Sequence, residues 1–175
     1  MDISSKIKDD HYVFDEFDYL VMALEDRRYL THGGIDLCSI VREMVKIVSF
    51  KKHGGASTID MQMVRTITNY KELTIKRKMY EMTLAILINF KFTKNQIMQC
   101  YMDNAFFGSH LIGASSTSRK IYNKEIHELN SLDKAKLAAM LLKPRPKKPS
   151  EEWFLSVQSR AIYAQSKRRF VKQGD

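Results

Sequence analysis

Two adjacent carboxylates, Glu25 and Asp26, follow an apolar stretch, and His32 comes after a short polar run. Carboxylates and an imidazole held close together are groups that perform general acid and base catalysis. Gly33 and Gly34 then let the chain turn back over Glu25. Without further context, a glutamate here is more often a solvated charge or the ion-pair partner of a nearby arginine. The spacing predicts an acid–base site, and a surface ion pair is the alternative.

Glu81 lies inside an apolar run that continues to Ile88. Because the run is apolar on every side of a helix, we expect this helix to be largely buried, where a bare carboxylate is costly. Arg77 and Lys78 lie one turn earlier and are possible ion-pair partners, each worth about 0.2–0.5 kcal/mol on an exposed helix. Such a pair is a weak reason to keep a charge in a core. Glu81 is therefore a second candidate catalytic residue.

The segment that begins at Ser57 has the pattern of a capping box, with Ser57 as the N-cap and Asp60 as its reciprocal partner. The N-terminus of a helix also presents free amides and the positive end of a dipole, which suits an anion. Thr58, Gln62 and Arg65 would then project along the helix towards the same ligand. The segment predicts a helix start that doubles as an anion site.

The elements that must position these residues are helices, because apolar residues recur at intervals of three and four far more than at intervals of two. The expected helices span residues 14–26, 36–50, 57–69, 74–91, 94–103, 112–121, 131–142 and 152–170. No strand pair is expected. Asp36, Thr93 and Ser131 are the expected N-caps of three of these helices.

Composition favours one domain over residues 1–175 and a polyanionic partner, since Lys and Arg number 29 against 20 Asp and Glu. Cys38 and Cys100 are far apart and lack metal-site spacing, so both are expected in the core.

No apolar run is long enough to cross a membrane, and the chain as given is expected to be soluble and to lack a signal peptide or anchor. Residues 40–52 form an apolar helix with a basic end, which suits either burial or a membrane surface.

Residues 25–34, 55–62 and 77–81 together resemble the first three signature motifs of the peptidoglycan glycosyltransferase domain, family 51. This domain occurs in class A penicillin-binding proteins and monofunctional transglycosylases. Residues 94–104 resemble its fourth motif, which packs the large lobe, and the similarity extends over about residues 14–172. The resemblance implies a mainly α fold with a lysozyme-like large lobe and a small membrane-facing lobe, without a transpeptidase domain. It also favours the membrane for the helix at 40–52.

The family resemblance implies an inverting transferase that polymerises lipid II into β-1,4 glycan strands and releases undecaprenyl pyrophosphate. It makes Glu25 the base for the acceptor hydroxyl and Glu81 the glutamate that positions the pyrophosphate or a divalent ion beside it. The residues implied in substrate binding are Asp26, His32, Ser57, Thr58, Gln62, Arg65, Arg77 and Lys78. Mg or Mn is the implied metal near Glu81, and no organic cofactor is expected.

The implied partners are lipid II, the growing glycan strand, the membrane surface and cell-wall synthesis proteins, at the outer, periplasmic face of a bacterial inner membrane.

The chain departs from the family pattern at four positions. Tyr29 stands where the family usually has phenylalanine, and Asp60 stands where it has threonine. Thr66 and Asp103 both stand where asparagine is usual. A carboxylate at position 60 would repel a pyrophosphate unless Arg65 or a metal ion compensates.

Three other functions fit parts of the sequence. A catalytically weakened homologue could bind lipid II or a cell-wall protein, and its two glutamates would be turned apart or sealed by salt bridges. A basic nucleic-acid binder would mass Lys and Arg on one face, whereas here they are spread over every segment, so nucleic acid is not an expected partner. A lysozyme-like hydrolase would share the fold but gives no reason for Arg77 and Lys78.

Overall fold

The computed structural model describes residues 4–7, 12–49, 55–70 and 72–171. Its α-helices are α1 (Glu16–Glu25), α2 (Leu37–Val48), α3 (Ile59–Thr68), α4 (Ile75–Lys91), α5 (Lys94–Asn104), α6 (Ala114–Tyr122), α7 (Ser131–Ala139) and α8 (Glu151–Lys167). Short 3-10 turns lie at Ser4–Lys6, Tyr29–Thr31, Ile126–Glu128 and Arg168–Phe170. Each expected helix is present with ends close to those predicted. The mainly helical fold class is confirmed.

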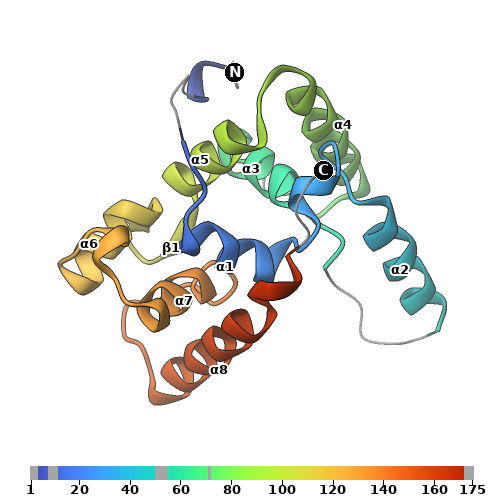
Figure 1. Ribbon diagram of the computed structural model, residues 1–175. Helices are drawn as coiled ribbons and strands as arrows, with labels where there is room; N and C mark the ends of the chain where they lie inside the picture. The colour runs from blue at the N-terminus through green and yellow to red at the C-terminus, as the bar shows by residue number, and fades with distance from the viewer. Residues whose placement is uncertain (1–3, 8–11, 50–54, 71, 172–175) are drawn as a thin grey trace.

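Helix α1 is the centre of the molecule (Figure 1). It packs against α7 and α8, while α3 packs against α4 and α5. Phe17, Leu20 and Val21 of α1 are at most 1% exposed. Burial of such side chains contributes about 1.5–3 kcal/mol each, so the apolar face of α1 fixes where its last residue, Glu25, comes to lie. Helix α2 projects from the body on the right of Figure 1.

The expectation that the chain has no strand pair is wrong. The chain contains a small antiparallel pair, β1 (Phe106–Gly108) and β2 (Leu111–Ile112). The pair is too short to give an alternating pattern. Gly108 has φ 147°, and a Cβ there would lie 2.3 Å from the carbonyl oxygen of Arg145, so this close approach requires glycine.

The expected N-caps are confirmed at two of the three helices. Thr93 caps α5 in a reciprocal box with Gln96, and Asp36 Oδ1 accepts a hydrogen bond from the backbone amide of Cys38 at 3.0 Å. At α7 the cap is Asn130, one residue before the predicted Ser131. Asparagine is as good an acceptor as serine, so sequence alone did not separate the neighbours.

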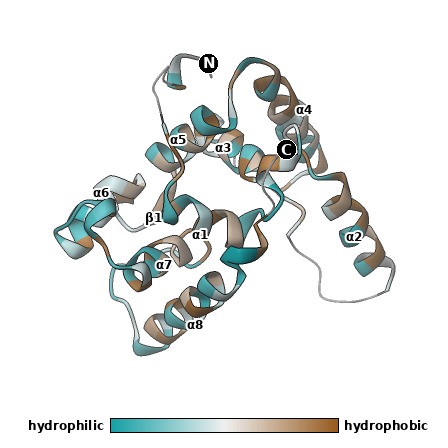
Figure 2. Ribbon diagram, viewed as in Figure 1, coloured by the Kyte–Doolittle hydropathy of each residue, from teal (hydrophilic) through white to brown (hydrophobic). Residues whose placement is uncertain are grey.

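Helices α2 and α4 carry many apolar residues, brown in Figure 2, and several of them are exposed. On α2 the exposed residues are Leu37, Val41, Met44 and Val45, each 59–65% exposed. On α4 only Glu81, Ala85 and Ile88 are buried, whereas Met79, Leu87 and Phe90 are exposed. The expectation of a largely buried α4 is wrong. For the expected helix at 40–52, the described residues of α2 contradict the buried alternative, while residues 50–52 lie outside the described residues.

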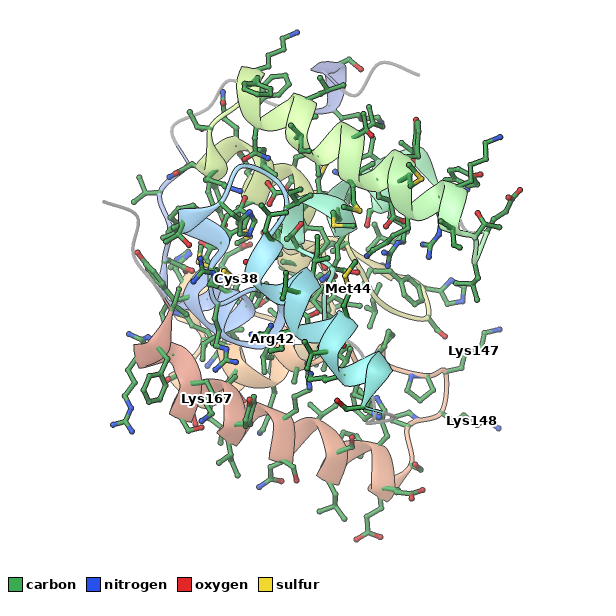
Figure 3. The ribbon with its side chains drawn as sticks, turned by 90° about the vertical axis from the view of Figure 1, so that its right-hand side faces the viewer. Cys38, Arg42, Met44, Lys147, Lys148 and Lys167 are labelled. Carbon is green, nitrogen blue, oxygen red and sulfur yellow. The ribbon has the colours of Figure 1, made fainter. Side chains whose placement is uncertain are left out.

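The two cysteines are free and differ in burial. Cys100 is buried as expected, whereas Cys38 is exposed on α2, where Figure 3 labels it with Arg42 and Met44. In the described part of the chain, no helix combines the length and apolarity needed to cross a bilayer.

Candidate active site

Glu25 ends α1 beside a cleft of about 590 Å³. The cleft lies between the end of α1, the inner side of α2 and the segment before α3. Its lining includes Glu25, Asp26, Arg28, Asp36, Ser39, Arg42, Glu43, Lys46, Ser57 and Thr58. Arg42 is visible on α2 in Figure 3. The walls carry both signs of charge, and some are paired: Lys46 Nζ lies 2.6 Å from Glu43 Oε1. A cleft of this size and polarity suits a polar, charged ligand.

The side chain of Glu25 is 10% exposed and has two hydrogen-bond donors among the described residues. Arg160 Nη2, from α8, lies 3.3 Å from Oε1. Gln62 Nε2, from α3, donates to Oε2 at 3.2 Å, and Gln62 Oε1 accepts from the Tyr101 hydroxyl at 2.8 Å. Each oxygen of Glu25 therefore keeps a second lone pair that can accept a proton.

Glu81 has very different surroundings. It is fully buried, and Arg65 donates to both of its oxygens at 2.8 and 2.9 Å. Arg77, one turn earlier on α4, donates to Oε1 at 2.8 Å. The hydrogen bonds with the Glu81 carboxylate raise the pKa of Arg65. The expected ion pair between Arg77 and Glu81 is confirmed. The alternative pair between Lys78 and Glu81 is not formed among the described contacts, and the second cation bound to Glu81 is Arg65.

Both glutamate oxygens at position 81 are thus engaged by cations. A divalent ion there would have to displace an arginine and would be repelled by the other one. The residues around Glu81 do not fit the Mg or Mn site that the family resemblance implies.

Lys78 instead points to the segment before α3, where its ammonium donates to the Ser57 hydroxyl at 2.7 Å. Burial lowers the pKa of Lys78, because desolvation disfavours the charged ammonium. Since Ser57 lines the cleft, this contact puts a cation at the edge of the cleft.

The predicted capping box of Ser57 and Asp60 is wrong. The N-cap of α3 is Thr58, whose hydroxyl accepts from the Met61 amide at 3.2 Å and donates to the Gly34 carbonyl at 2.6 Å. Gly34 has φ 96°, and a Cβ there would lie 2.3 Å from the backbone of α4, so this loop needs glycine. The Thr58 hydroxyl is therefore used within the protein, and its contact with a substrate stays a prediction.

Asp60 belongs to a buried charge network behind the cleft. The ammonium of Lys94 lies 3.0 Å from both Asp60 oxygens, and Asn89 donates at 2.8 Å. Burial raises the pKa of Asp60 and lowers that of Lys94. His32 Nε2 lies 2.9 Å from Asp26 Oδ2, while its Nδ1 faces Asp60 at 3.9 Å.

Asp26, His32 and Asp60 offer one ligand atom each within 4.8 Å of one another. Lys94 already balances the charge of Asp60, so a metal ion would have to displace its ammonium. The network explains how Asp26 and His32 shape the loop after Glu25: Asp26 Oδ2 also accepts from the Ile59 amide at 3.2 Å and ties this loop to α3.

The family model for transglycosylases matches residues 6–171. The chain belongs to the transglycosylase family. Penicillin-binding protein 1A of Rickettsia prowazekii is 36% identical over 134 residues, or 74% of this chain and 16% of that protein. A Cupriavidus necator protein, provisionally named a transglycosylase, is 35% identical over 130 residues, or 74% of this chain and 54% of that protein. The chain spans 16% of the Rickettsia relative and about half of the Cupriavidus one.

In this transglycosylase chain, the structure brings Glu25, Asp26 and Ser57 to one cleft and encloses Glu81 behind Arg65 and Arg77. The substrate contacts of the predicted residues stay predictions. Sequence reasoning missed two residues at the site, Arg160 and Tyr101. Tyr101 lay in the motif assigned to packing, and Arg160 lay on α8 without any local signal.

Proposed function

We propose that this transglycosylase polymerises lipid II into β-1,4 glycan strands and releases undecaprenyl pyrophosphate. One observation carries the proposal. The same cleft is lined by the Glu25 carboxylate and by Ser57, whose hydroxyl holds the ammonium of Lys78. A base and a cation at one cleft are what glycosyl transfer with a pyrophosphate leaving group needs.

In the proposed reaction, Glu25 takes the proton from the 4-hydroxyl of the acceptor sugar. That oxygen forms a bond to the anomeric carbon of the donor as the bond to pyrophosphate breaks, with inversion. Lys78 and the outward N–H groups of Arg65, which is 35% exposed, offset the charge that develops on the pyrophosphate. Glu81 fixes the two arginines, and no step requires a metal ion.

We also propose that the exposed apolar faces of α2 and α4 rest on the membrane that carries the lipid substrate. Leu73, two residues before α4, and Phe90 of α4 are 92% and 84% exposed, which is costly in water and favourable at the acyl boundary. The proposed location is the outer, periplasmic face of a bacterial inner membrane, with the glycan strand and cell-wall synthesis proteins as partners.

A second function is favoured by one observation. Glu81 is sealed by salt bridges, as expected for a homologue that binds lipid II or a cell-wall protein without catalysing transfer. Glu25 argues for the enzyme, since it is not sealed in the same way.

Labelled lipid II separates the two functions. The protein is incubated with lipid II in detergent, with added Mg or Mn or with a chelator, and the products are resolved by size. We expect glycan polymers from the wild type and none from Glu25→Gln. The chelator should change the amount of polymer by less than about twofold, because Lys78 and Arg65 stabilise the charge on the pyrophosphate without a metal ion. Binding without polymer would establish the second function, and strict dependence on a divalent ion would refute the metal-free mechanism.

A further inference from the structure

Glu25 lies at the end of a hydrogen-bond chain that begins in the fourth motif. The Tyr101 hydroxyl donates to Gln62 Oε1 at 2.8 Å, and Gln62 Nε2 donates to Glu25 Oε2 at 3.2 Å. We propose that Tyr101 and Gln62 are positioning residues that hold the Glu25 carboxylate for proton transfer. This assignment rests on the proposed function.

The chemistry of the groups fixes the direction of the chain. A carboxylate only accepts hydrogen bonds, so Gln62 must turn its amino group to Glu25 and its carbonyl oxygen to Tyr101. That oxygen also only accepts, so the Tyr101 hydroxyl must donate. Burial raises the pKa of Tyr101, and the nearby charge of Glu25 raises it further, so the hydroxyl keeps its proton.

Tyr101 has a specific task in this arrangement. A glutamine amide can rotate about its last bond, and the rotated form would set Gln62 Oε1 against the carboxylate of Glu25. The Tyr101 hydroxyl favours the productive form, because its proton would otherwise lose its acceptor in a buried environment. Arg160 holds the other oxygen, so both oxygens of Glu25 are fixed by side chains from two different helices.

The hydrogen-bond chain from Tyr101 to Glu25 also gives Gln62 a role other than direct substrate binding. Its amide is engaged at both ends inside the protein, at Oε1 by Tyr101 and at Nε2 with Glu25. We call the hydrogen-bonded series Tyr101–Gln62–Glu25 the relay, and we expect its loss to lower the rate of transfer and not the affinity for substrate.

Tyr101→Phe tests the relay, and Tyr29→Phe is its matched control. Tyr29 is also buried, and its hydroxyl also donates at 2.8 Å, but to the Lys94 carbonyl. We expect Tyr101→Phe to lower kcat about 5–10-fold with KM within about twofold, whereas Tyr29→Phe changes kcat less than about twofold at a similar loss of thermal stability. The acidic limb of the pH–rate profile should move to higher pH only in Tyr101→Phe, because the Glu25 carboxylate loses an oriented donor.

A double mutant separates a relay from a packing effect. If Tyr101 acts through Gln62, adding Tyr101→Phe to Gln62→Leu costs no further kcat. Additive losses, or equal kcat and pH profiles in the two tyrosine variants, would overturn the proposal.

A second measurement does not depend on activity. The side-chain amide resonances of Gln62, identified by their loss in Gln62→Leu, should shift in Tyr101→Phe and stay in place in Tyr29→Phe. Unchanged resonances in Tyr101→Phe would refute the relay. If the resonances shift as expected but the wild type makes no polymer from lipid II, the proposed function fails and the hydrogen-bond chain stands.

Discussion

Glu25 keeps a tenth of its side chain exposed beside a cleft, whereas Glu81 is fully enclosed between two arginines. Glu25 has two contacts of 3.2 and 3.3 Å, while Glu81 accepts three charge-assisted hydrogen bonds of 2.8–2.9 Å. Loosely held carboxylates can exchange protons with a ligand, and tightly clamped ones serve as fixed charges. We therefore expect the two glutamates of one family pattern to have separate tasks, proton transfer for Glu25 and cation positioning for Glu81.

Replacing Glu25, the proposed base, should have the largest effect on activity. Glu25→Gln keeps the shape and removes the proton acceptor, so we expect polymer formation to fall about 10²–10⁴-fold. The free energy of unfolding should change by less than about 1 kcal/mol, since the contacts of Glu25 are long and partly exposed. Lipid II polymerisation and urea unfolding measure both quantities. Full activity in this variant would remove Glu25 from the mechanism.

Replacing the clamped glutamate should instead act on stability. Glu81→Gln leaves Arg77, whose side chain is 11% exposed, and the more exposed Arg65 without a counter-ion, which is expected to cost about 3–5 kcal/mol. Glu125→Gln is the control, because the Glu125–Arg119 pair is exposed and is expected to contribute at most about 1 kcal/mol. Urea unfolding compares the two variants. Similar losses in both would show that the arginine clamp is not stabilising.

Asp18 extends the comparison to a buried carboxylate whose described partners are neutral. It accepts from the Tyr12 hydroxyl at 2.6 Å and from the Asp15 amide at 3.0 Å, and burial raises its pKa to about 7 from 3.8. Native Asp18 thus holds its proton more tightly than the unfolded chain does, so its contribution to stability falls as pH rises from about 4 to about 7. The stability of the wild type relative to Asp18→Asn should fall by up to about 4 kcal/mol over this range, by urea unfolding. A difference that stays constant with pH would contradict the raised pKa.

The smallest effect is expected at Asp60, a buried carboxylate with one lysine partner. Asp60→Thr removes the counter-ion of Lys94, whose side chain is 17% exposed, and should cost about 1–3 kcal/mol. Asp60 does not take part in capping α3. Its carboxylate is fully buried and paired with Lys94, so we do not expect it to repel a pyrophosphate in the cleft. Polymerisation by Asp60→Thr should therefore not rise.

A double mutant checks the origin of that cost. Thermal unfolding of Asp60→Thr combined with Lys94→Met should show part of the stability recovered, since removing both charges leaves none unpaired. Strictly additive losses would show that the pair is not what Asp60 contributes.

Local patterns predicted the helices and the caps at Asp36 and Thr93, because these depend on residues within one turn. The site depends on contacts that no local rule contains. Arg65 meets Glu81 across 16 positions of sequence, and Arg160 meets Glu25 across 135. The box assigned to Ser57 and Asp60 had the right residue types, but Lys94, 34 positions away, holds Asp60 instead.

The surroundings of the two glutamates meet on α3, where Gln62 contacts Glu25 and Arg65 contacts Glu81. These two residues are about 4.5 Å apart along the helix axis, less than one turn. A residue inserted between them would rotate Arg65 by about 100° and detach one glutamate from its partner. One helix therefore sets the distance between the Gln62 contact to Glu25 and the Arg65 contact to Glu81. Substitutions can alter the surroundings of either glutamate, whereas an insertion or deletion within α3 would change the spacing of these two contacts.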